Sequence, residues 1–340
     1  MRTPILVLFF LLVLFSSNSQ VIKEANARLF SIVEKGDTIS FLKTDTCLTR
    51  KKPAILFCQG SLPIPMVIVD SKGSFIPDFN FDYRKLSERY NIIVISMPHT
   101  PAIVKAEHLN KQYEYILDTT NQISYSPLYL RDNYLEKYVE RAEKVIDFLK
   151  KQKWVDNTKI AIFGHSQGSY IAARLAAKNN IIKVLGYSGG NPDGRFAQYI
   201  RSKRRAVLTK KTSAQQAQKD INKLYETWSL YCKGIDKDSI GIDNVNSWKS
   251  FSYSAREELV KMKTPIYVAY GTEDLEHAES CDLLPIYFER VGKTNYKMMP
   301  LVGCGHNFEE ISPEGMPNWD KMHWDDVING FVQWWESLSK

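Results

Sequence analysis

Residues 159–168, KIAIFGHSQG, decide the fold that the sequence predicts, because they are typical of a strand, a sharp turn and the start of a helix. The apolar run 159–163 predicts a buried strand, and residues 164–168 match the pattern G-x-S-x-G. The next run, 170–177, YIAARLAA, favours a helix. A serine on a tight turn between strand and helix is lifted clear of the sheet, and the flanking glycines keep β-carbons out of the crowded turn. We therefore predict that Ser166 is a nucleophile.

A second stretch, residues 186–190, GYSGG, matches the same pattern. Its serine, Ser188, also follows a strand candidate, but the residues after it, 189–194, GGNPDG, form a loop and break any helix. The turn that exposes a nucleophile requires a helix behind it, so Ser166 is favoured. We expect Ser188 at the mouth of an inserted cap.

The sequence on either side of this stretch alternates short apolar runs with longer helical ones. Strand candidates lie at residues 53–58, 91–96, 159–163, 181–187, 265–270 and 296–301. Helix candidates lie at about 133–153, 168–178, 283–291 and 324–337. Strands that are apolar along their length and separated by helices predict an α/β fold with a doubly wound, mostly parallel sheet. Residues 24–50 are expected to form an opening antiparallel piece.

The strand–helix alternation stops between Gly190 and Met262. About seventy residues of helical, polar and aromatic character are far more than a connection requires, which predicts a helical cap or lid over residues 191–262. The α/β core would then comprise residues 20–190 and 263–340. Four aromatic residues of the cap either face a substrate or pack the cap's own small core: Trp228, Tyr231, Trp248 and Phe251.

A serine hydroxyl is a poor nucleophile at neutral pH, so it needs a base and the base needs an orienting carboxylate. Asp274 follows the strand candidate 265–270, and His306 follows the candidate 296–301 in the same way. Catalytic groups of open α/β sheets gather at the carboxyl ends of strands, and the order Ser, acid, His is the one expected there. We predict a triad of Ser166, Asp274 and His306.

Other residues compete for two of these roles. Glu273 or Asp282 is an alternative acid. His165 is adjacent to the serine and poorly placed to accept its proton. None of the remaining histidines has the strand-end context of His306; these are His99, His108, His277 and His323.

An acyl-transfer transition state also needs preorganised donors for its oxyanion. We predict the backbone N–H of Gln167, the residue after the nucleophile, and that of Ser61 in the loop 59–63. The alternative for this loop is an ordinary strand-ending turn.

The N-terminal residues 1–19 resemble a signal peptide. Arg2 precedes an apolar run too short to span a bilayer, and Ser17-Asn18-Ser19 fits a cleavage site that leaves Gln20 first. The alternative is an uncleaved membrane anchor. We expect export to the periplasm or the medium, with no integral membrane span after the signal is removed.

The formal charge of +7 depends partly on one basic run. That run favours a solvated helix face, with binding to an acidic partner or a membrane surface as the alternative. Its members are Arg201, Lys203, Arg204, Arg205, Lys210 and Lys211. No nucleic-acid-binding module accompanies it, so nucleic acid is not an expected partner.

Five cysteines remain after the predicted cleavage, an odd count, and Cys281–Cys304 is one candidate bridge. No Cys/His spacing indicates zinc, and we expect neither a metal nor an organic cofactor.

The stretches 154–168, 265–274 and 303–306 resemble the catalytic domains of the prolyl oligopeptidase and acylaminoacyl-peptidase group of α/β-hydrolases. The resemblance covers about residues 50–190 and 263–340, and it implies the doubly wound fold and the triad Ser166, Asp274 and His306. Two features depart from it. About fifty preceding residues cannot form the β-propeller of such peptidases, and Gln59-Gly60 stands where many lipases and esterases carry His-Gly.

These observations predict an exported serine hydrolase that cleaves carboxylic esters through an acyl-enzyme. We prefer esters because the chain is compact and capped, without a propeller that would select peptides. The alternatives are a peptidase or amidase acting on short peptides or acylated amines, and a non-catalytic binding protein on a hydrolase scaffold. The expected partner is a small ester or short acylated substrate, and the sequence does not indicate an oligomeric state.

Overall fold

The computed structural model describes residues 19–34, 37–235 and 243–338. The predicted signal peptide, residues 1–19, lies outside the described residues except for Ser19, which begins the first strand. Among the described residues, no helix has both the length and the apolar character needed to cross a bilayer.

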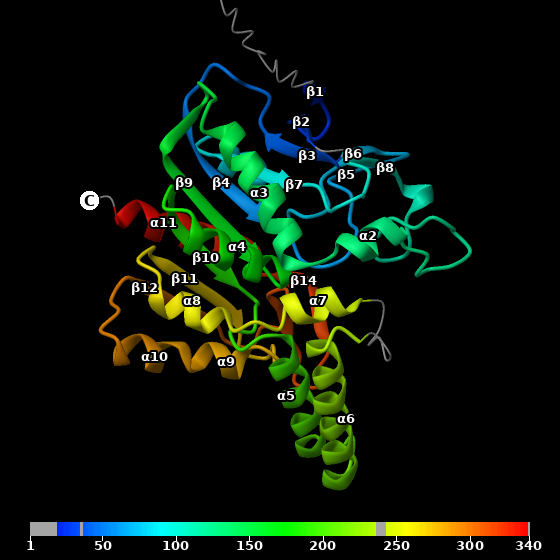
Figure 1. The fold of residues 1–340 in the computed structure, drawn as a ribbon. Coiled ribbons are helices and arrows are strands. Elements are labelled where there is room, and N and C mark those ends of the chain that lie inside the picture. The colour runs from blue at the N-terminus through cyan, green and yellow to red at the C-terminus, as the bar shows by residue number, and fades with distance from the viewer. Residues whose placement is uncertain (1–18, 35–36, 236–242, 339–340) are drawn as a thin grey trace, which may run out of the picture.

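The centre of the molecule is a nine-stranded sheet in the order β1-β2-β3-β7-β4-β9-β10-β11-β12 (Figure 1). The strands are β1 Ser19–Ile22, β2 Ala27–Glu34, β3 Asp37–Thr44, β4 Lys52–Cys58, β7 Asn91–Ile95, β9 Val155–His165, β10 Ile182–Ser188, β11 Ile266–Gly271 and β12 Tyr296–Leu301. β1, β2 and β3 pair antiparallel, β3 pairs antiparallel with β7, and every pair from β7 to β12 is parallel. This order confirms the predicted doubly wound, mostly parallel sheet with an antiparallel opening.

Helices cover both faces of the sheet. One face carries α3 Leu135–Leu149, α4 Gln167–Lys178, α8 Ala255–Lys261, α9 Ala278–Asp282 and α10 Leu284–Arg290; the other carries α1 Tyr83–Ser87 and α11 Trp324–Ser337. Side chains of a strand alternate between the faces, so Ile160 and Ile162 of β9 pack on the first side while Ala161 and Phe163 pack on the second. This burial on both faces explains why the central strands are apolar along their whole length.

The strand order reverses direction at β4. The chain goes from β4 to β7 on one side of it, then returns to β9 on the other side. In open α/β sheets the crevice at such a switch point, outside the carboxyl ends of the strands, is where ligands bind. The loop after β4 and the turn after β9 therefore form the expected location of a site.

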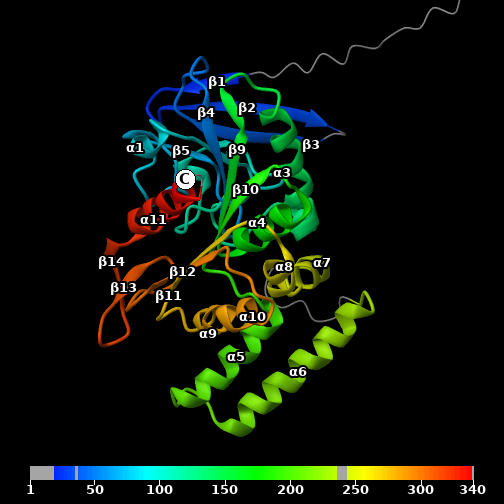
Figure 2. The same ribbon diagram turned by 90° about the vertical axis from the view of Figure 1, so that its left-hand side faces the viewer.

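The segment between β10 and β11 has two parts. α5 Arg195–Leu208 and α6 Ala214–Cys232 form a helical hairpin that projects from the body, with α7 Val245–Ser250 beside α6 (Figures 1 and 2). α8, by contrast, packs on α4 of the body. Ala255 and Leu259 of α8 are fully buried in the main core. The predicted cap of residues 191–262 thus contains a projecting hairpin and, at its end, a helix of the core layer.

Several short elements are absent from the sequence prediction. β5 Val67–Asp70, β6 Gly73–Phe75 and β8 Ile103–Lys105 form a three-stranded sheet, and β13 Glu309–Ile311 pairs with β14 Pro317–Met322. The 3-10 helix η1 Ala106–His108 and α2 Pro127–Asp132 lie between β8 and α3. These segments are short and partly polar, so they lack the apolar runs that identify the central strands.

Candidate active site

Ser166 lies on the turn between β9 and α4 with φ 55° and ψ −124°. Such a backbone conformation costs a residue other than glycine about 1–3 kcal/mol, which the surrounding structure must offset. A β-carbon at Gly164 would lie 2.1 Å from the carbonyl oxygen of Gly168, and one at Gly168 would lie 2.0 Å from that of Cys58. Both glycines are therefore required where helix, turn and β4 crowd together, as the pentapeptide pattern predicts.

Ser166, His306 and Asp274 meet at the carboxyl end of the sheet. The Nε2 atom of His306 is 3.1 Å from the Oγ of Ser166, and its Nδ1 is 2.7 Å from the Oδ2 of Asp274. The side chain of Asp274 is only 6% exposed, whereas that of His306 is 32% exposed. The structure thus brings the three predicted residues into one hydrogen-bonded chain, with the serine end open to the cleft.

The loops after β11 and β12 are held against each other, which fixes the acid beside the base. Thr272 donates its N–H to the carbonyl of Leu301, and Glu273 donates to that of Cys304. A β-carbon at Gly271 would lie 2.2 Å from the carbonyl oxygen of Gly305. Gly271 therefore permits this close approach.

The two alternative acids have other surroundings. Glu273 is exposed to solvent. Asp282 accepts a hydrogen bond from the hydroxyl of Tyr270. Among the described residues, only Asp274 of these three carboxylates contacts His306.

The electrostatics of the pair fit a base held by its acid. Burial alone would raise the pKa of Asp274, but hydrogen bonds from His277 and His306 outweigh it and hold the pKa below its ordinary range. Burial would lower the pKa of His306, but the bond to Asp274 and its charge raise it above the ordinary value. The lowered pKa of Asp274 means that its carboxylate is ionised beside the His306 ring.

Asp274 has a second histidine partner that sequence reasoning missed. The Nδ1 atom of His277 is 2.7 Å from the Oδ1 of Asp274, so both carboxylate oxygens accept a bond from an imidazole. The rings of His277 and His306 stack with centroids 4.9 Å apart at 29°. The only signal in the sequence is the spacing of three residues between Asp274 and His277, which is common and uninformative by itself.

His165 supports the other side of the base. Its ring centroid is 5.0 Å from that of His306, and its Nδ1 lies 3.0 Å from the Oγ of Ser188. Burial, together with the nearby His306, holds the pKa of His165 well below its ordinary value, so this ring is neutral. Ser188, expected at the mouth of the cap, is instead fully buried at the end of β10.

The two predicted oxyanion donors lie on either side of the nucleophile. Ser61 and Gln167 both line the cleft that holds Ser166, and a β-carbon at Gly60 would lie 3.7 Å from the β-carbon of Ser166. The first N–H groups of a helix have no intrahelical acceptor. Neither the N–H of Ser61 nor that of Gln167 has a backbone acceptor among the described residues, so both donors are available to a ligand.

The cleft has a volume of about 440 Å³, and its wall is polar and apolar in about equal parts. It is lined by Ser61, Leu62, Asn133, Ser166, Gln167, Tyr170, Arg195, Gln198, Tyr199, Asp243, Asp274, Glu276, His277 and His306. The start of α5 contributes part of this wall. Arg195 donates to the Oε1 of Gln167 at 2.9 Å and pairs with Asp243 at 2.7 Å, which ties the cap to the turn behind the nucleophile.

The four aromatic residues predicted as substrate contacts pack inside the protein instead. Phe196 of α5 lies 4.8 Å from Trp228, 5.3 Å from Trp248 and 6.3 Å from Tyr231, measured between ring centroids. Phe251 is fully buried against α3 and α4. Within the described part of the chain, none of the four lines the cleft: three of them pack around Phe196 in the cap, and Phe251 packs in the core of the body.

Asp274, His277 and His306 are also the described residues whose geometry could accommodate a metal ion, with ligand atoms within 4.8 Å of one another. Their hydrogen bonds already use both carboxylate oxygens and both Nδ1 atoms, which fits a base and its supports better than a metal centre.

All five cysteines are free thiols, so the candidate bridge Cys281–Cys304 is absent.

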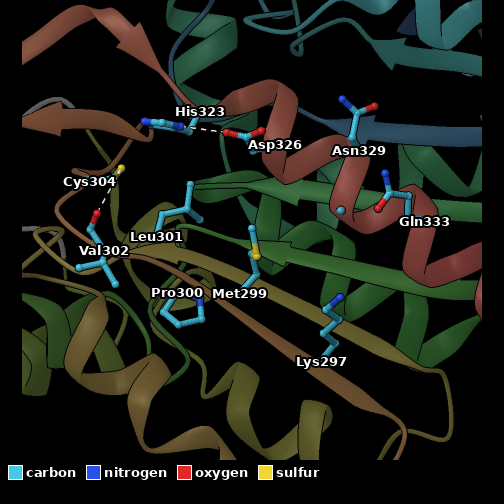
Figure 3. A pocket seen from close by; sticks show the side chains of 11 residues that line it. Lys297, Met299, Pro300, Leu301, Val302, Cys304, His323, Asp326, Asn329 and Gln333 are labelled. Atoms are coloured by element: carbon cyan, nitrogen blue, oxygen red, sulfur yellow. Dashed lines mark hydrogen bonds and ion pairs between the residues drawn. The ribbon is translucent and has the colours of Figure 1, made fainter.

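A second hollow, of about 510 Å³, lies between β12 and α11 (Figure 3). It contains Cys304 and His323, and burial raises the pKa of the Cys304 thiol, which opposes formation of a thiolate. His323 hydrogen-bonds to Asp326 there. No serine or threonine is among the described residues that line this hollow.

Comparison with known proteins shows which solved structures share this fold. No protein-family model matches the chain, and no curated protein sequence matches it. Many solved structures are similar at low sequence identity, and three of them illustrate the likeness. The α/β hydrolase GrgF from Penicillium sp. sh18 has a TM-score of 0.53 and 13% identity, over 92% of this chain and 98% of that one. The acetyl xylan esterase from Paenibacillus sp. R4 has a TM-score of 0.52 and 12% identity, over 94% and 89%.

The third is the acylaminoacyl peptidase from Pyrococcus horikoshii, with a TM-score of 0.51 and 16% identity over 96% of this chain. The chain spans 41% of the length of that peptidase, and 35% of a dipeptidyl aminopeptidase IV-like protein from Bacteroides ovatus that it also resembles. At such identities the likeness concerns the fold, and it agrees with the strand order and with the turn at Ser166. The chain therefore has the α/β-hydrolase fold.

Proposed function

We propose that this protein is a serine hydrolase that cleaves carboxylic esters, with Ser166 as nucleophile, His306 as base and Asp274 as the orienting acid. The observation that carries the proposal is the hydrogen-bonded chain of 3.1 Å from Ser166 to His306 and 2.7 Å from His306 to Asp274. The serine at the end of this hydrogen-bonded chain has a φ of 55° and lies at the switch point of the sheet. A serine, an imidazole and a carboxylate in this arrangement are the recurring parts of acyl transfer.

The reaction proceeds in two steps. His306 takes the proton of Ser166 as its oxygen attacks the ester carbonyl, and the N–H groups of Ser61 and Gln167 stabilise the tetrahedral oxyanion. The oxyanion collapses, the C–O bond to the alcohol breaks, and His306 gives its proton to the departing alkoxide. A water molecule, deprotonated by His306, then attacks the acyl carbon; the bond from this carbon to the Ser166 oxygen breaks, His306 returns its proton to that oxygen, and the acid is released. No metal or organic cofactor takes part.

Esters are proposed ahead of amides by analogy with the solved structures that the chain resembles in fold. The chain matches 89% of the acetyl xylan esterase but only 41% of the acylaminoacyl peptidase. A peptidase or amidase is the second candidate, because Glu276 places a carboxylate in the cleft wall where a substrate's amino group would bind. A binding protein that no longer catalyses is the third.

Covalent labelling by a fluorophosphonate tests the nucleophile. We expect the wild-type protein and Ser188→Ala to react, and Ser166→Ala not to react. Ser188 is the matched control because it stands in the other G-x-S-x-G sequence. Labelling of Ser166→Ala at the wild-type rate would refute the assignment, and absence of labelling in the wild type would favour the binding protein.

Turnover of two substrate sets separates the first two candidates. We expect p-nitrophenyl esters of short acids to be hydrolysed with a kcat/KM at least 100-fold above that of aminoacyl p-nitroanilides. The reverse order would replace the esterase by the peptidase while leaving the triad in place.

We also propose that the protein is exported, on the strength of the apolar run in residues 1–19. N-terminal sequencing of the protein recovered from the periplasm or the medium should begin at Gln20. Recovery of the intact N-terminus in a membrane fraction would support the alternative of an uncleaved anchor.

A further inference from the structure

The positive charge of this protein is concentrated in the hairpin of α5 and α6. Residues 195–235, here called the arm, carry ten Lys or Arg against two Asp or Glu, whereas the whole chain has 45 against 38. The rest of the chain is therefore close to neutral. The arm projects from the body (Figure 2), and the reaction proposed at Ser166 does not require this charge.

The cations at the base of the arm are used within the protein. Arg195 pairs with Asp243 at 2.7 Å, and Arg201 pairs with Asp193 at 2.6 Å. Arg205 lies 3.8 Å from Glu279 and donates to the carbonyl of Leu275. These guanidinium groups fasten the arm to the body.

The cations at the far end of the arm have no such partners. Residues 204 and 206–223, here called the tip, include four exposed lysines, Lys210, Lys211, Lys219 and Lys223. None of the four forms an ion pair among the described residues, and Arg204 contacts only the amide oxygen of Gln218. The tip therefore presents a cationic surface that the fold itself does not neutralise.

An apolar side chain stands among these cations. Leu208, the last residue of α5, is 80% exposed, and the turn after it carries Lys210 and Lys211. A single exposed leucine is ordinary on a protein surface. Basic residues around an exposed apolar side chain are, in contrast, the combination by which helices bind the surface of anionic membranes.

We propose that the tip of the arm docks on an anionic lipid surface. The lysines are attracted to the lipid headgroups, and Leu208 enters the boundary between headgroups and acyl chains. α5 has fourteen residues and is about 21 Å long. When Leu208 docks on the lipid, Arg195 at the opposite end of α5 lies about 21 Å from it along the helix.

The composition of the tip favours a lipid surface over a soluble polyanion. Lysine is a compact point charge without fixed geometry, which suits a diffuse layer of headgroups, whereas arginine forms the bidentate contacts of discrete phosphate or carboxylate recognition. Three of the four arginines of the arm are held at its base, whereas four of the unpaired cations at the tip are lysines. A soluble polyanion would also gain nothing from Leu208.

Co-sedimentation with vesicles tests the proposal. The probe is a vesicle of 30% phosphatidylglycerol in phosphatidylcholine, compared with pure phosphatidylcholine at low ionic strength. We expect the wild type to bind only the anionic vesicles and to be released at about 0.5 M NaCl, where the Debye length is short. Replacing the four lysines Lys210, Lys211, Lys219 and Lys223 by Gln should weaken binding by about 100-fold or more, since each contributes roughly a fivefold factor near the surface. Leu208→Ser should weaken it by about two- to fivefold.

A matched variant removes four exposed lysines elsewhere and so causes the same change in net charge. These are Lys72, Lys111, Lys153 and Lys263. We expect this variant to keep wild-type binding within about threefold if the tip is the docking site. All variants share one N-terminal segment, so its contribution cancels, and circular dichroism establishes that each has folded.

Three results would overturn the proposal. They are equal binding to pure phosphatidylcholine, equal weakening by the control variant, and tight binding of soluble polyglutamate that survives Leu208→Ser. The last would identify the tip as a site for a polyanion. None of these measurements uses ester hydrolysis, so they stand apart from the test of the proposed function.

Discussion

Two serines of this protein lie in the same pentapeptide pattern on neighbouring parallel strands, yet only one is placed for chemistry. His165 of β9 pairs in register with Ser188 of β10, so Ser166 and Ser188 are almost side by side. Ser166 is partly exposed at φ 55° in front of α4, whereas Ser188 is fully buried and continues into a loop in which Gly189 has the positive φ. The element after each serine, a helix in one case and a loop in the other, decides its role.

The second serine nevertheless supports the first. The carbonyl oxygen of Ser188 accepts the backbone N–H of Ser166 at 2.9 Å, and its Oγ is bonded to His165 beside the base. The two motifs thus form one unit, in which Ser166 is the reactive part and Ser188 the supporting part. Substitutions that change one part of this unit at a time should therefore have very different effects.

The largest effect is expected from the nucleophile itself. Ser166→Ala removes the attacking oxygen and should lower kcat/KM for a p-nitrophenyl ester by about 10⁵-fold or more. Ser188→Ala removes only a buried hydrogen bond and should cost less than about tenfold. Steady-state kinetics of the two variants measures the contrast, and comparable losses would mean that the serines do not have separate roles.

The next largest effect is expected from the acid. Asp274→Asn keeps the size of the side chain but offers His306 the wrong hydrogen-bond pattern, and it should lower kcat by about 10⁴-fold. Glu273→Gln is the matched control, because its exposed carboxylate does not contact the base, and it should change kcat by less than about twofold. If Glu273→Gln lost as much kcat as Asp274→Asn, the result would contradict the assignment of Asp274 alone as the acid.

Replacing the last glycine of each motif by alanine should reduce the stability of the protein by different amounts. A β-carbon at Gly168 meets backbone atoms, the nearest being the carbonyl oxygen of Cys58 at 2.0 Å, while one at Gly190 meets the Oγ of Ser169 at 1.9 Å. Backbone yields less than a side chain, so Gly168→Ala should lower the free energy of unfolding by about 3 kcal/mol or more and Gly190→Ala by less. Urea unfolding of both variants measures the difference, and an equal loss would contradict it.

The acid side of the pH–rate profile should report the pKa of His306. Only the neutral imidazole accepts the serine proton, so kcat/KM falls as the pH drops through this pKa. Because Asp274 raises the pKa of His306 above its ordinary value, the fall should begin at a higher pH than for a free imidazole. In Asp274→Asn the raising charge is gone, and the midpoint of the residual activity should move to lower pH. A midpoint that stays in place would mean that another group controls the profile.

The sequence predicts the architecture well because the central strands are buried on both faces. The run 159–163 and its counterparts are rich in apolar residues, several of them β-branched, and this composition separates them from most helices and loops. The three triad residues are predictable for a related reason, since each directly follows such a strand. Short elements such as β5 and β13 lie outside the core of the sheet and have no comparable pattern.

Side-chain partners within loops and caps are harder to predict. Trp248 and Phe251 have the composition of a binding wall, but composition does not distinguish a ring that lines a cleft from one that fills a core, and both rings are buried. His277 lacks the strand-end context that identifies His306. Its position depends on the turn after Asp274, which only the three-dimensional structure reveals.

The smallest effect is expected at His277, the residue that sequence reasoning missed. The ring of His277 is hydrogen-bonded to the Oδ1 atom of Asp274, the carboxylate oxygen that His306 does not use. Without this bond, in His277→Asn, the carboxylate should rotate more freely, and kcat should fall by about three- to tenfold with little change in KM. The midpoint of the acid limb should stay above that of free imidazole, because Asp274 still faces His306 in this variant. His277→Gln restores a donor of greater reach and should recover part of the loss. A 10⁴-fold loss, or a midpoint shifted as far as in Asp274→Asn, would instead make His277 as important to the base as Asp274.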